Sequence, residues 1–330
     1  MAGAKHIGEN AMRRLLLAAV LLLPVAARAQ EQAWPAREAV RVVVCAPAGS
    51  TVDLTARLWT EALKDRLGAT FVVDPRAGAG GMIGAEAVAR ARPDGYTLGV
   101  CFPGPFTMRP HLVANLPIDP LKDLRPVALL MTAPFVFVVD AKLGTTLPEF
   151  VAKAKASDLS YASVGNGSLA HLGMELFLSR AGVRMVHVPY AGSPPALADI
   201  LGGRVAAFIT PLSGVQAQIA DGRLAALFST GPARLPQLPA VPTAREAGLA
   251  DLEIVTWHGL FAPRGVPEPI VARLAAAVAD AVQNDTRLKD GMARAGADLV
   301  TFTPAQAEAM IAAESATWQA VIRAANIKAE

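Results

Sequence analysis

The chain has 330 residues, of which 53% are hydrophobic and 18% are charged. This length exceeds what one hydrophobic core usually serves, so it predicts two domains. The formal charge of +3 comes from 31 basic and 28 acidic residues, but four of the basic residues and one acidic residue lie in the first 29 positions. The remaining 27 of each kind balance, which excludes bulk charge as a basis for binding nucleic acid or a membrane surface. Any anion must therefore be attracted by local geometry.

The first 29 residues have the organisation of a secretory signal peptide. A basic region (13–14) precedes an apolar run (15–25) that is too short to span a bilayer, and an A-x-A cleavage site follows at 27–29. We therefore expect cleavage after Ala29 and export to the periplasm. The polar residues before Met12 are unusual for a signal peptide, which makes Met12 a second candidate for the initiator.

Two cysteines, Cys45 and Cys101, would enter an oxidising compartment after export. Each ends a predicted strand, and these two strands are neighbours in the usual order of doubly wound folds. A disulfide and a pair of buried free thiols both remain open. No group of Cys and His residues has the spacing of a metal site, so we expect neither a metal nor a cofactor.

Strand and helix patterns alternate from residue 39 onward, which predicts a parallel α/β sheet. A helix is expected to start at Ser50, with Asp53 as its capping partner, and to end at Gly68. Another helix is expected to start at a capping box over 303–306. The expected strands are 39–46, 70–74, 96–101, 134–140, 159–163, 183–192, 204–210 and 224–229. The other expected helices include 147–156, 169–182, 193–203 and 214–222, with a Pro- and Gly-punctuated crossover at 256–267 and two or three helices after it.

Two signatures of other protein classes are incomplete in this sequence. The glycines of "GAGGMIG" (78–84) resemble a nucleotide loop, but the register, the ribose-binding acid and the lysine of such loops are missing. Ser168 and His171 could share one face of a helix, yet no G-x-S-x-G elbow or orienting carboxylate accompanies them. Ser168 as a helix N-cap is the simpler interpretation. A secreted serine hydrolase stays as an alternative function.

Two segments have the pattern of an anion cradle, in which a strand leads through a glycine loop into a capped helix. They are "APAGST" (46–51) and "GNGSLAH" (165–171). Free backbone N–H groups and the positive end of the helix dipole favour an anion at such a helix start. One cradle in each half of a two-domain protein would face the other across a cleft. This arrangement explains how a neutral chain could hold a carboxylate.

Six collinear blocks resemble the periplasmic substrate-binding proteins of tripartite tricarboxylate transporters, the Bug family, over nearly the whole mature length. The blocks are "RAGAGGMIGAEAVARARPDGYTL", "LPIDPLKDLRPVALL", "YASVGNGSLAHLGMELF", "VHVPYAGSPPALADILGGRV", "LPQLPAVPTAREAGL" and "LFAPRGVPEPIVARL". The resemblance implies a type II periplasmic-binding-protein fold, with a ligand cleft between two α/β domains and two crossovers. It places one domain at 34–130 plus 259–330 and the other at 131–258.

The resemblance also implies a function without catalysis. A small carboxylate is captured largely by backbone amides and waters and is delivered to a membrane permease, although a sensor kinase is also open as the partner. We expect a monomer. Carried over onto this sequence, the expected ligand-binding residues are Ala48, Gly49, Ser50, Thr51, Asp53, Gly80, Gly81, Ser163, Gly165, Asn166, Gly167, Ser168, His171, Tyr190 and Gly192, together with Phe102 and Thr210 at positions that depart from the family.

These departures predict a less polar pocket. Phe102 follows a strand where the family has small polar residues, and Ala206 and Thr210 stand where it commonly carries aspartates. We therefore expect an aromatic or otherwise apolar-tailed carboxylate rather than citrate, with packing of Phe102 under the loop as the alternative. The first loop, "CAPAGSTVD", has one glycine where two are usual. His258 replaces an apolar residue. Two roles are open for it: a contact with the ligand or the hinge, and a purely structural role at the domain boundary.

Overall fold

The computed structural model describes residues 34–252 and 254–324, so the predicted signal peptide and Met12 lie outside the described residues. Strands and helices alternate there as the sequence predicts. The strands are β1 (Val40–Val44), β2 (Phe71–Pro75), β3 (Thr97–Cys101), β4 (Leu124–Asp140), β5 (Ser160–Ser163), β6 (Val186–Pro189), β7 (Ala207–Pro211), β8 (Leu224–Ser229) and β9 (Val255–Pro263). The α-helices are α2 (Thr51–Leu67), α3 (Met82–Ala89), α4 (Arg109–Leu112), α5 (Pro120–Asp123), α6 (Leu147–Ala156), α7 (Leu169–Ala181), α8 (Ser193–Leu201), α9 (Gln216–Ala220), α10 (Glu268–Asn284), α11 (Thr286–Arg294) and α12 (Pro304–Ala324).

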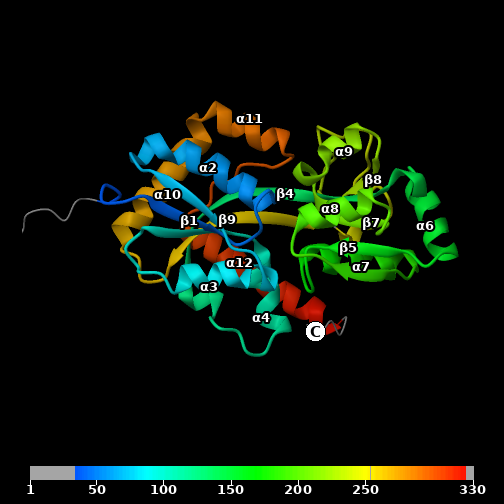
Figure 1. The fold of residues 1–330 in the computed structure, drawn as a ribbon, viewed down its shortest axis with the longest axis horizontal. Helices are drawn as coiled ribbons and strands as arrows, with labels where there is room; N and C mark the ends of the chain where they lie inside the picture. Colours follow the sequence, from blue (N-terminus) through cyan, green and yellow to red (C-terminus); the bar gives the residue numbers. More distant parts are fainter. Residues whose placement is uncertain (1–33, 253, 325–330) are drawn as a thin grey trace, which may run out of the picture.

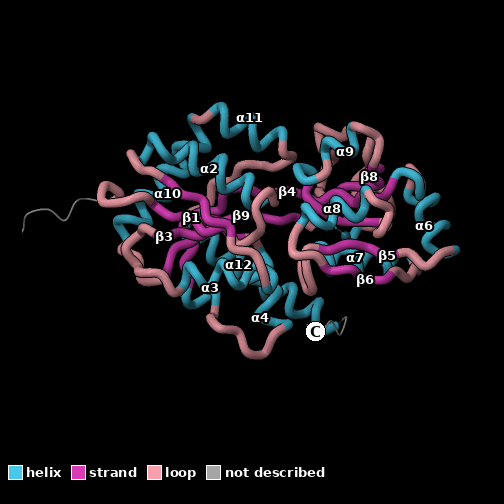
Figure 2. Tube along the Cα trace, viewed as in Figure 1, coloured by secondary structure: helices cyan, strands magenta, loops and turns pink. Residues whose placement is uncertain are grey.

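The strands form two halves that share long strands (Figure 1). Their order is β2-β1-β3-β9-β4-β7-β5-β6, and β8 also pairs with β4. In the first half β1 lies parallel to β2 and β3, and in the second half β5 lies parallel to β6 and β7. Helices cover the strands in both halves (Figure 2). The carboxyl ends of parallel strands, where loops lead into helices, are the usual place for a ligand site in such sheets.

Two strands, β4 and β9, cross from one half to the other. Residues 124–134 of β4 pair antiparallel with β9, and residues 135–140 pair with β7 and β8. The sequence predicts a strand only at 134–140, which starts at Pro134. The strand continues through both prolines, since Pro126 lies at an irregularity of the ladder and Pro134 at the end of the pairing with β9. Likewise, the crossover expected at 256–267 is mostly the regular strand β9.

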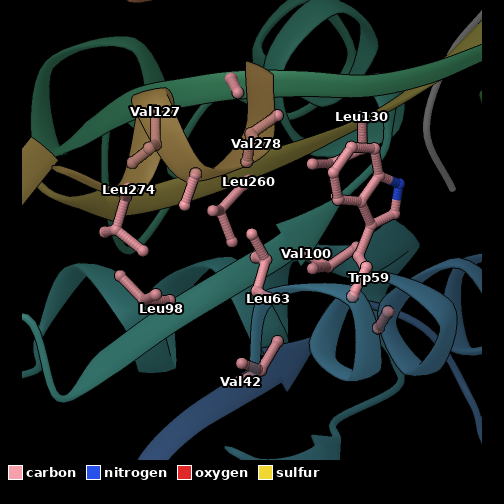
Figure 3. Packing of buried hydrophobic residues seen from close by; sticks show 14 of the residues in the cluster. Val42, Trp59, Leu63, Leu98, Val100, Val127, Leu130, Leu260, Leu274 and Val278 are labelled. Atoms are coloured by element: carbon pink, nitrogen blue, oxygen red, sulfur yellow. The ribbon is translucent and has the colours of Figure 1, made fainter. Parts of the chain in front are cut away.

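Each half has its own hydrophobic core. In the first half, side chains from β1, β3, α2 and α10 point into one space, as Figure 3 shows for Val42, Leu98, Leu63 and Leu274. The second half is built around a group of phenylalanines in which the rings of Phe137 and Phe228 stack 4.9 Å apart. At roughly 25 cal/mol per Å² of buried apolar surface, such clusters provide the main stabilising contribution of each half.

The division into domains at 34–130 plus 259–330 and 131–258 stays a prediction. The change of partners on β4 after Pro134 supports a boundary on this strand. Helix α12 connects the two groups of core residues, because Ile311 packs in the first half while Ile322 joins the phenylalanine cluster. Figure 1 shows α12 in the centre of the molecule, with the C-terminus beneath it.

Local helix-capping signals have the expected roles. Ser50 accepts a hydrogen bond from the N–H of Asp53, Gly68 ends α2 in the left-handed conformation, and Thr303 and Gln306 exchange the bonds of a capping box. The helix expected at 214–222 is shorter in the structure, where it is α9 and follows a 3-10 turn at 212–214.

Within the described residues, none of the helices combines the length and the apolar character needed to cross a membrane.

Candidate ligand-binding site

A cavity of about 320 Å³ lies between the two halves. Its wall is formed by the loops that leave β1, β2, β3, β5, β6 and β7 and by residues of the crossing strands. Among the residues predicted for the site, those that line it are Ser50, Thr51, Gly80, Gly81, Phe102, Gly165, Asn166, Ser168, Tyr190, Gly192 and Thr210. The remaining predicted residues, Ala48, Gly49, Asp53, Ser163, Gly167 and His171, lie outside this lining.

The loop from β1 to α2 presents the start of α2 to the cavity. The Asp53 carboxylate is buried and turned back toward the loop, because its Oδ2 accepts from the N–H of Gly49 at 2.9 Å and from Nε of Arg57 at 3.0 Å. Ala48 and Gly49 are exposed at the outer side of this loop. The N–H groups of Thr51 and Val52, which line the cavity, form no hydrogen bond within the described residues. Asp53 therefore shapes the loop, and the two amides face the ligand space.

The loop from β5 to α7 is built in the same way. Ser168 caps α7 by accepting from the N–H of His171 at 3.2 Å, and Nδ1 of His171 accepts from the N–H of Gly167 at 2.9 Å. Gly167 has a φ of +70°, and a Cβ there would lie 1.9 Å from Leu112 of the other half. Leu169 and Ala170 line the cavity, and their N–H groups also form no hydrogen bond in the part of the chain that the structure describes. His171 thus holds the loop from behind.

A group of stacked rings supports this second loop. The imidazoles of His171 and His187 stack 3.9 Å apart, and Oγ of Ser163 lies 2.6 Å from Nε2 of His187. Burial, together with the neighbouring His171, lowers the pKa of His187 to about 4. The hydroxyl of Tyr161 donates to Glu175, whose carboxylate lies 3.9 Å from Nε2 of His171. Ser163 and His171 therefore belong to the support of the loop.

The glycine-rich segment after β2 forms a third part of the wall. Gly78, Ala79, Gly80 and Gly81 all have positive φ values, which favours glycine at most of these positions. The ring of Phe102 lies against this segment, since a Cβ on Gly81 would meet it at 2.9 Å. Phe102 also lines the cavity. From this one position it can both make the pocket less polar and pack against the loop, which were its two expected roles.

Tyr190 and Thr210 reach the cavity from the second half. The Tyr190 hydroxyl donates to Asp199 at 2.7 Å, and burial, together with this carboxylate, raises the pKa of Tyr190 to about 12. The phenol is thus neutral and directed away from the ligand space, to which Tyr190 contributes its ring. The Oγ1 atom of Thr210 is buried and has no hydrogen-bond partner among the described residues, which leaves it available to a ligand.

The polar residues of the wall that were not among the predicted site residues are Arg109, Ser193, Thr256 and His258. His258 on β9 is fully buried, and its Nδ1 lies 2.8 Å from Oγ1 of Thr55, while burial lowers its pKa to about 3. Arg109, at the start of α4, also lines the cavity. The sequence could have indicated Arg109, since it follows the carboxyl end of β3, where parallel sheets place their ligands.

The sequence model of the tripartite tricarboxylate transporter family receptor, TctC, matches residues 55–327. Among curated relatives, the protein BugT of Bordetella pertussis is 36% identical over 308 residues, which are 92% of this chain and 94% of BugT.

Solved structures have the same fold. MatC from Rhodopseudomonas palustris with bound malate superposes with a TM-score of 0.81 at 33% identity and covers 87% of this chain and 99% of its own. A second R. palustris protein, with adipate, has a TM-score of 0.85 at 33% identity, with coverage of 89% and 99%. These findings confirm the expected type II periplasmic-binding-protein fold. With two α/β halves, a cavity between them and this match over most of its length, the chain belongs to the tripartite tricarboxylate transporter receptor family, which includes the Bug proteins.

Proposed function

We propose that this chain is an extracytoplasmic solute-binding protein that captures a small carboxylate between its two halves. It then delivers the carboxylate to the permease subunits of a tripartite tricarboxylate transporter. Two proteins of similar sequence and fold, MatC and the second R. palustris protein, were solved with malate and adipate. The family model favours a permease as the partner, and no observation on this chain favours a sensor kinase.

One observation carries the proposal: two helix starts from different halves present unpaired amides to the same cavity. The N–H groups of Thr51 and Val52 come from α2, and those of Leu169 and Ala170 come from α7. Each helix start also carries the positive end of a helix dipole. A carboxylate between them accepts hydrogen bonds from both halves and so favours the arrangement in which the halves are together.

The remaining wall suits an apolar part of the ligand. Phe102, Met108, Phe135 and Ile209 line the cavity, and a volume of about 320 Å³ is small for a ligand site. We therefore propose an aromatic or otherwise apolar-tailed carboxylate. The site proposed for it consists of the predicted residues that line the cavity, with Asp53, Ser163, Gly167 and His171 as supports of its loops.

The alternative of a serine hydrolase has no geometric support. The Oγ of Ser168 accepts from the backbone of His171, and Nδ1 of His171 accepts from the backbone of Gly167. A hydrolase needs the imidazole to accept the proton of the serine hydroxyl. These contacts instead direct both side chains to the loop, in keeping with a binding protein that performs no reaction. Monomeric action in the periplasm is a further part of the proposal.

Isothermal titration calorimetry against carboxylates tests the proposal. The exported protein is unfolded, dialysed and refolded to remove co-purified ligand, and is then titrated with aliphatic and aromatic acids in a buffer without carboxylates. We expect saturable binding at one site, strongest for acids with an apolar part, and no turnover of an ester panel. If only small polar polyacids bind, the proposal that the ligand has an apolar tail is wrong. Ester turnover that is lost in Ser168→Ala would favour the hydrolase.

A further inference from the structure

His258 is a polar residue of the cavity wall and takes no part in the two helix starts that are proposed to hold the carboxylate. It lies on β9 and lines the cavity together with Thr256. Side chains two residues apart on a strand point to the same face, so both come from one face of a strand that connects the two halves. The imidazole is therefore available for another part of the ligand.

The imidazole of His258 is neutral at pH 7. Burial lowers its pKa to about 3, so the ring carries no charge there. A neutral imidazole has one N–H donor and one acceptor nitrogen. Within residues 34–252 and 254–324, the hydrogen bond of this ring is the one between Nδ1 and Oγ1 of Thr55, at 2.8 Å. Thr55 therefore determines which of the two nitrogens carries the proton.

The hydroxyl of Thr55 has a single proton to donate. Its Oγ1 donates to the carbonyl oxygen of Thr51, one turn earlier in α2, at 3.0 Å, and a carbonyl oxygen can only accept. This bond to the preceding turn is common for threonine inside a helix. With its proton used there, Oγ1 offers a lone pair to His258. Nδ1 then carries the N–H group and donates, which leaves Nε2 as an unprotonated acceptor.

Nε2 is the polar atom of the ring that remains for the ligand. His258 lines the cavity and Thr55 does not, so Nδ1 is directed behind the wall. Nε2 forms no hydrogen bond in the part of the chain that the structure describes. A buried acceptor without a partner is costly, so it indicates a donor from outside the chain. A carboxylate does not serve, because an ionised carboxylate only accepts.

We propose that Nε2 of His258 accepts a hydrogen bond from an uncharged donor on the apolar part of the ligand, while Thr55 fixes the ring proton on Nδ1. The ligand class is then an acid that also carries a hydroxyl or ring N–H group, such as a hydroxyaromatic acid. This inference rests on the proposed function, since it assumes that the carboxylate lies between α2 and α7. Thr55 is a positioning residue, because it acts through the imidazole.

Nuclear magnetic resonance tests the position of the ring proton without any ligand. In protein with isotope-labelled histidine at pH 7, two-bond proton–nitrogen correlations show which nitrogen of each ring is protonated, and His258→Leu identifies the signal of His258. We expect the proton on Nδ1 in the wild-type protein. In Thr55→Val the acceptor for this N–H group is gone, so the share of the form protonated at Nε2 should rise. A wild-type ring protonated at Nε2 would show that the inference is wrong, whatever the protein binds.

Calorimetry with matched acids tests the ligand class. The hydroxyl of meta- or para-hydroxybenzoate can donate, para-methoxybenzoate keeps the oxygen without the proton, and benzoate lacks the group. Hexanoate with and without a terminal hydroxyl is the aliphatic pair. We expect the wild-type protein to bind at least one hydroxy acid about tenfold or more tightly than its partner without the donor. In His258→Leu this ratio should fall to about one, and in Thr55→Val to an intermediate value.

Controls separate the possible failures. Thr60→Val removes an exposed hydroxyl from the same helix, so it should change neither the ring proton nor the ratio. Thermal melting shows that each variant is folded before it is titrated, and Thr55→Val carries the test if His258→Leu does not fold. If the hydroxy acids bind no more tightly than their partners, or the preference survives in both variants, the inference is wrong while the proposed function stands. If the wild-type protein binds none of these acids, the proposed function and the ligand class both fail.

Discussion

At the scale of single residues, the polar groups near the cavity divide into supports and ligand contacts. Asp53 and His171 both turn toward the backbone of their own loops, at Gly49 and Gly167. Buried polar groups are costly without partners, and a loop N–H group at four residues' distance is the partner that the local fold provides. By contrast, Oγ1 of Thr210 and Nε of Arg109 are buried without a hydrogen-bond partner among the described residues.

The buried imidazole of His258 should make stability depend on pH. Its pKa is about 3 in the folded protein and close to 6.5 when unfolded, so the unfolded state binds a proton first as the pH falls. The free energy of unfolding therefore decreases below pH 6.5, by about 2 kcal/mol between pH 7 and pH 5 for this group. We expect His258→Gln to remove that part of the decrease, as measured by urea unfolding without ligand.

A matched variant tests whether the ring itself is responsible. Thr55→Val removes the hydroxyl beside Nδ1 but leaves the imidazole buried, so it should retain the pH dependence. An unchanged slope in His258→Gln would show that other groups, such as His187, account for the acid destabilisation.

At the scale of elements, helix caps and the two strand-ending cysteines determine how the loops of the site are held. The caps are local, because Ser50 and Ser168 each bond to a residue three positions later. The cysteines are distant in sequence, but β1 and β3 lie side by side and their ends meet. Cys45 and Cys101 form a disulfide with Cα atoms 5.0 Å apart, which resolves the alternative that the sequence left open.

Loss of the cap on α7 should reduce stability by a small, defined amount. Ser168→Ala leaves the N–H of His171 without its acceptor, and we expect a cost of about 1 kcal/mol in urea unfolding. Ser179→Ala makes the same change at an exposed position inside the same helix, where it should be neutral or slightly stabilising. Equal effects of the two variants would argue against the capping role.

Reduction of the disulfide should have a larger effect. The bond closes a loop across 56 residues, so we expect its removal to cost about 2–4 kcal/mol of unfolding free energy. Thermal melting of the wild-type protein with and without reductant, compared with the Cys45→Ala/Cys101→Ala variant, measures this cost. Recovery of two free thiols in a non-reducing peptide map of the exported protein would contradict the bond.

At the scale of the whole molecule, the two halves touch at glycines on both sides of the cavity. Gly192 of the second half lies against Pro47, and Gly167 lies against Leu112. In both pairs one residue belongs to the first half. These glycines therefore permit the approach of the halves that a shared ligand requires, with β4 and β9 as the connections between them.

A side chain at Gly192 should impair ligand capture more than folding. A Cβ there would lie 2.4 Å from Cγ of Pro47 in the other half, whereas the extended backbone of Gly192 accepts alanine. Overpacking of this kind typically costs about 1–3 kcal/mol, so we expect Gly192→Ala to weaken carboxylate binding about tenfold or more. Gly202→Ala, at the end of the same helix and without an inter-half contact, is the control. A large drop in melting temperature with unchanged affinity would contradict this account.

Much of the fold and the two capped loops of the candidate site could be predicted from the sequence, because those signals are local. Hydrophobic periodicity predicted the strands, and serines before glycine-flanked helix starts predicted the two cradles, since each signal depends on residues within a turn or two. The regular strand β9 in the crossover region and the length of β4 were harder to predict, because β4 and β9 pair with each other and this pairing continues β4 through Pro126 and Pro134. The strand propensity of single residues contains no information about a pairing partner that is distant in the sequence.

The amino-acid sequence by itself determined the alternation of strands and helices, the capped loops and the charge balance that requires local anion binding. Only the tertiary structure decided which of these groups share one cavity. His258 meets Thr55 across 203 residues, and Arg109 meets Gly80 only because β2 and β3 both flank β1. The physical reason is range: caps and periodicity act between near neighbours, whereas burial, charge pairing and the closing of a cavity depend on what packing brings from far along the chain.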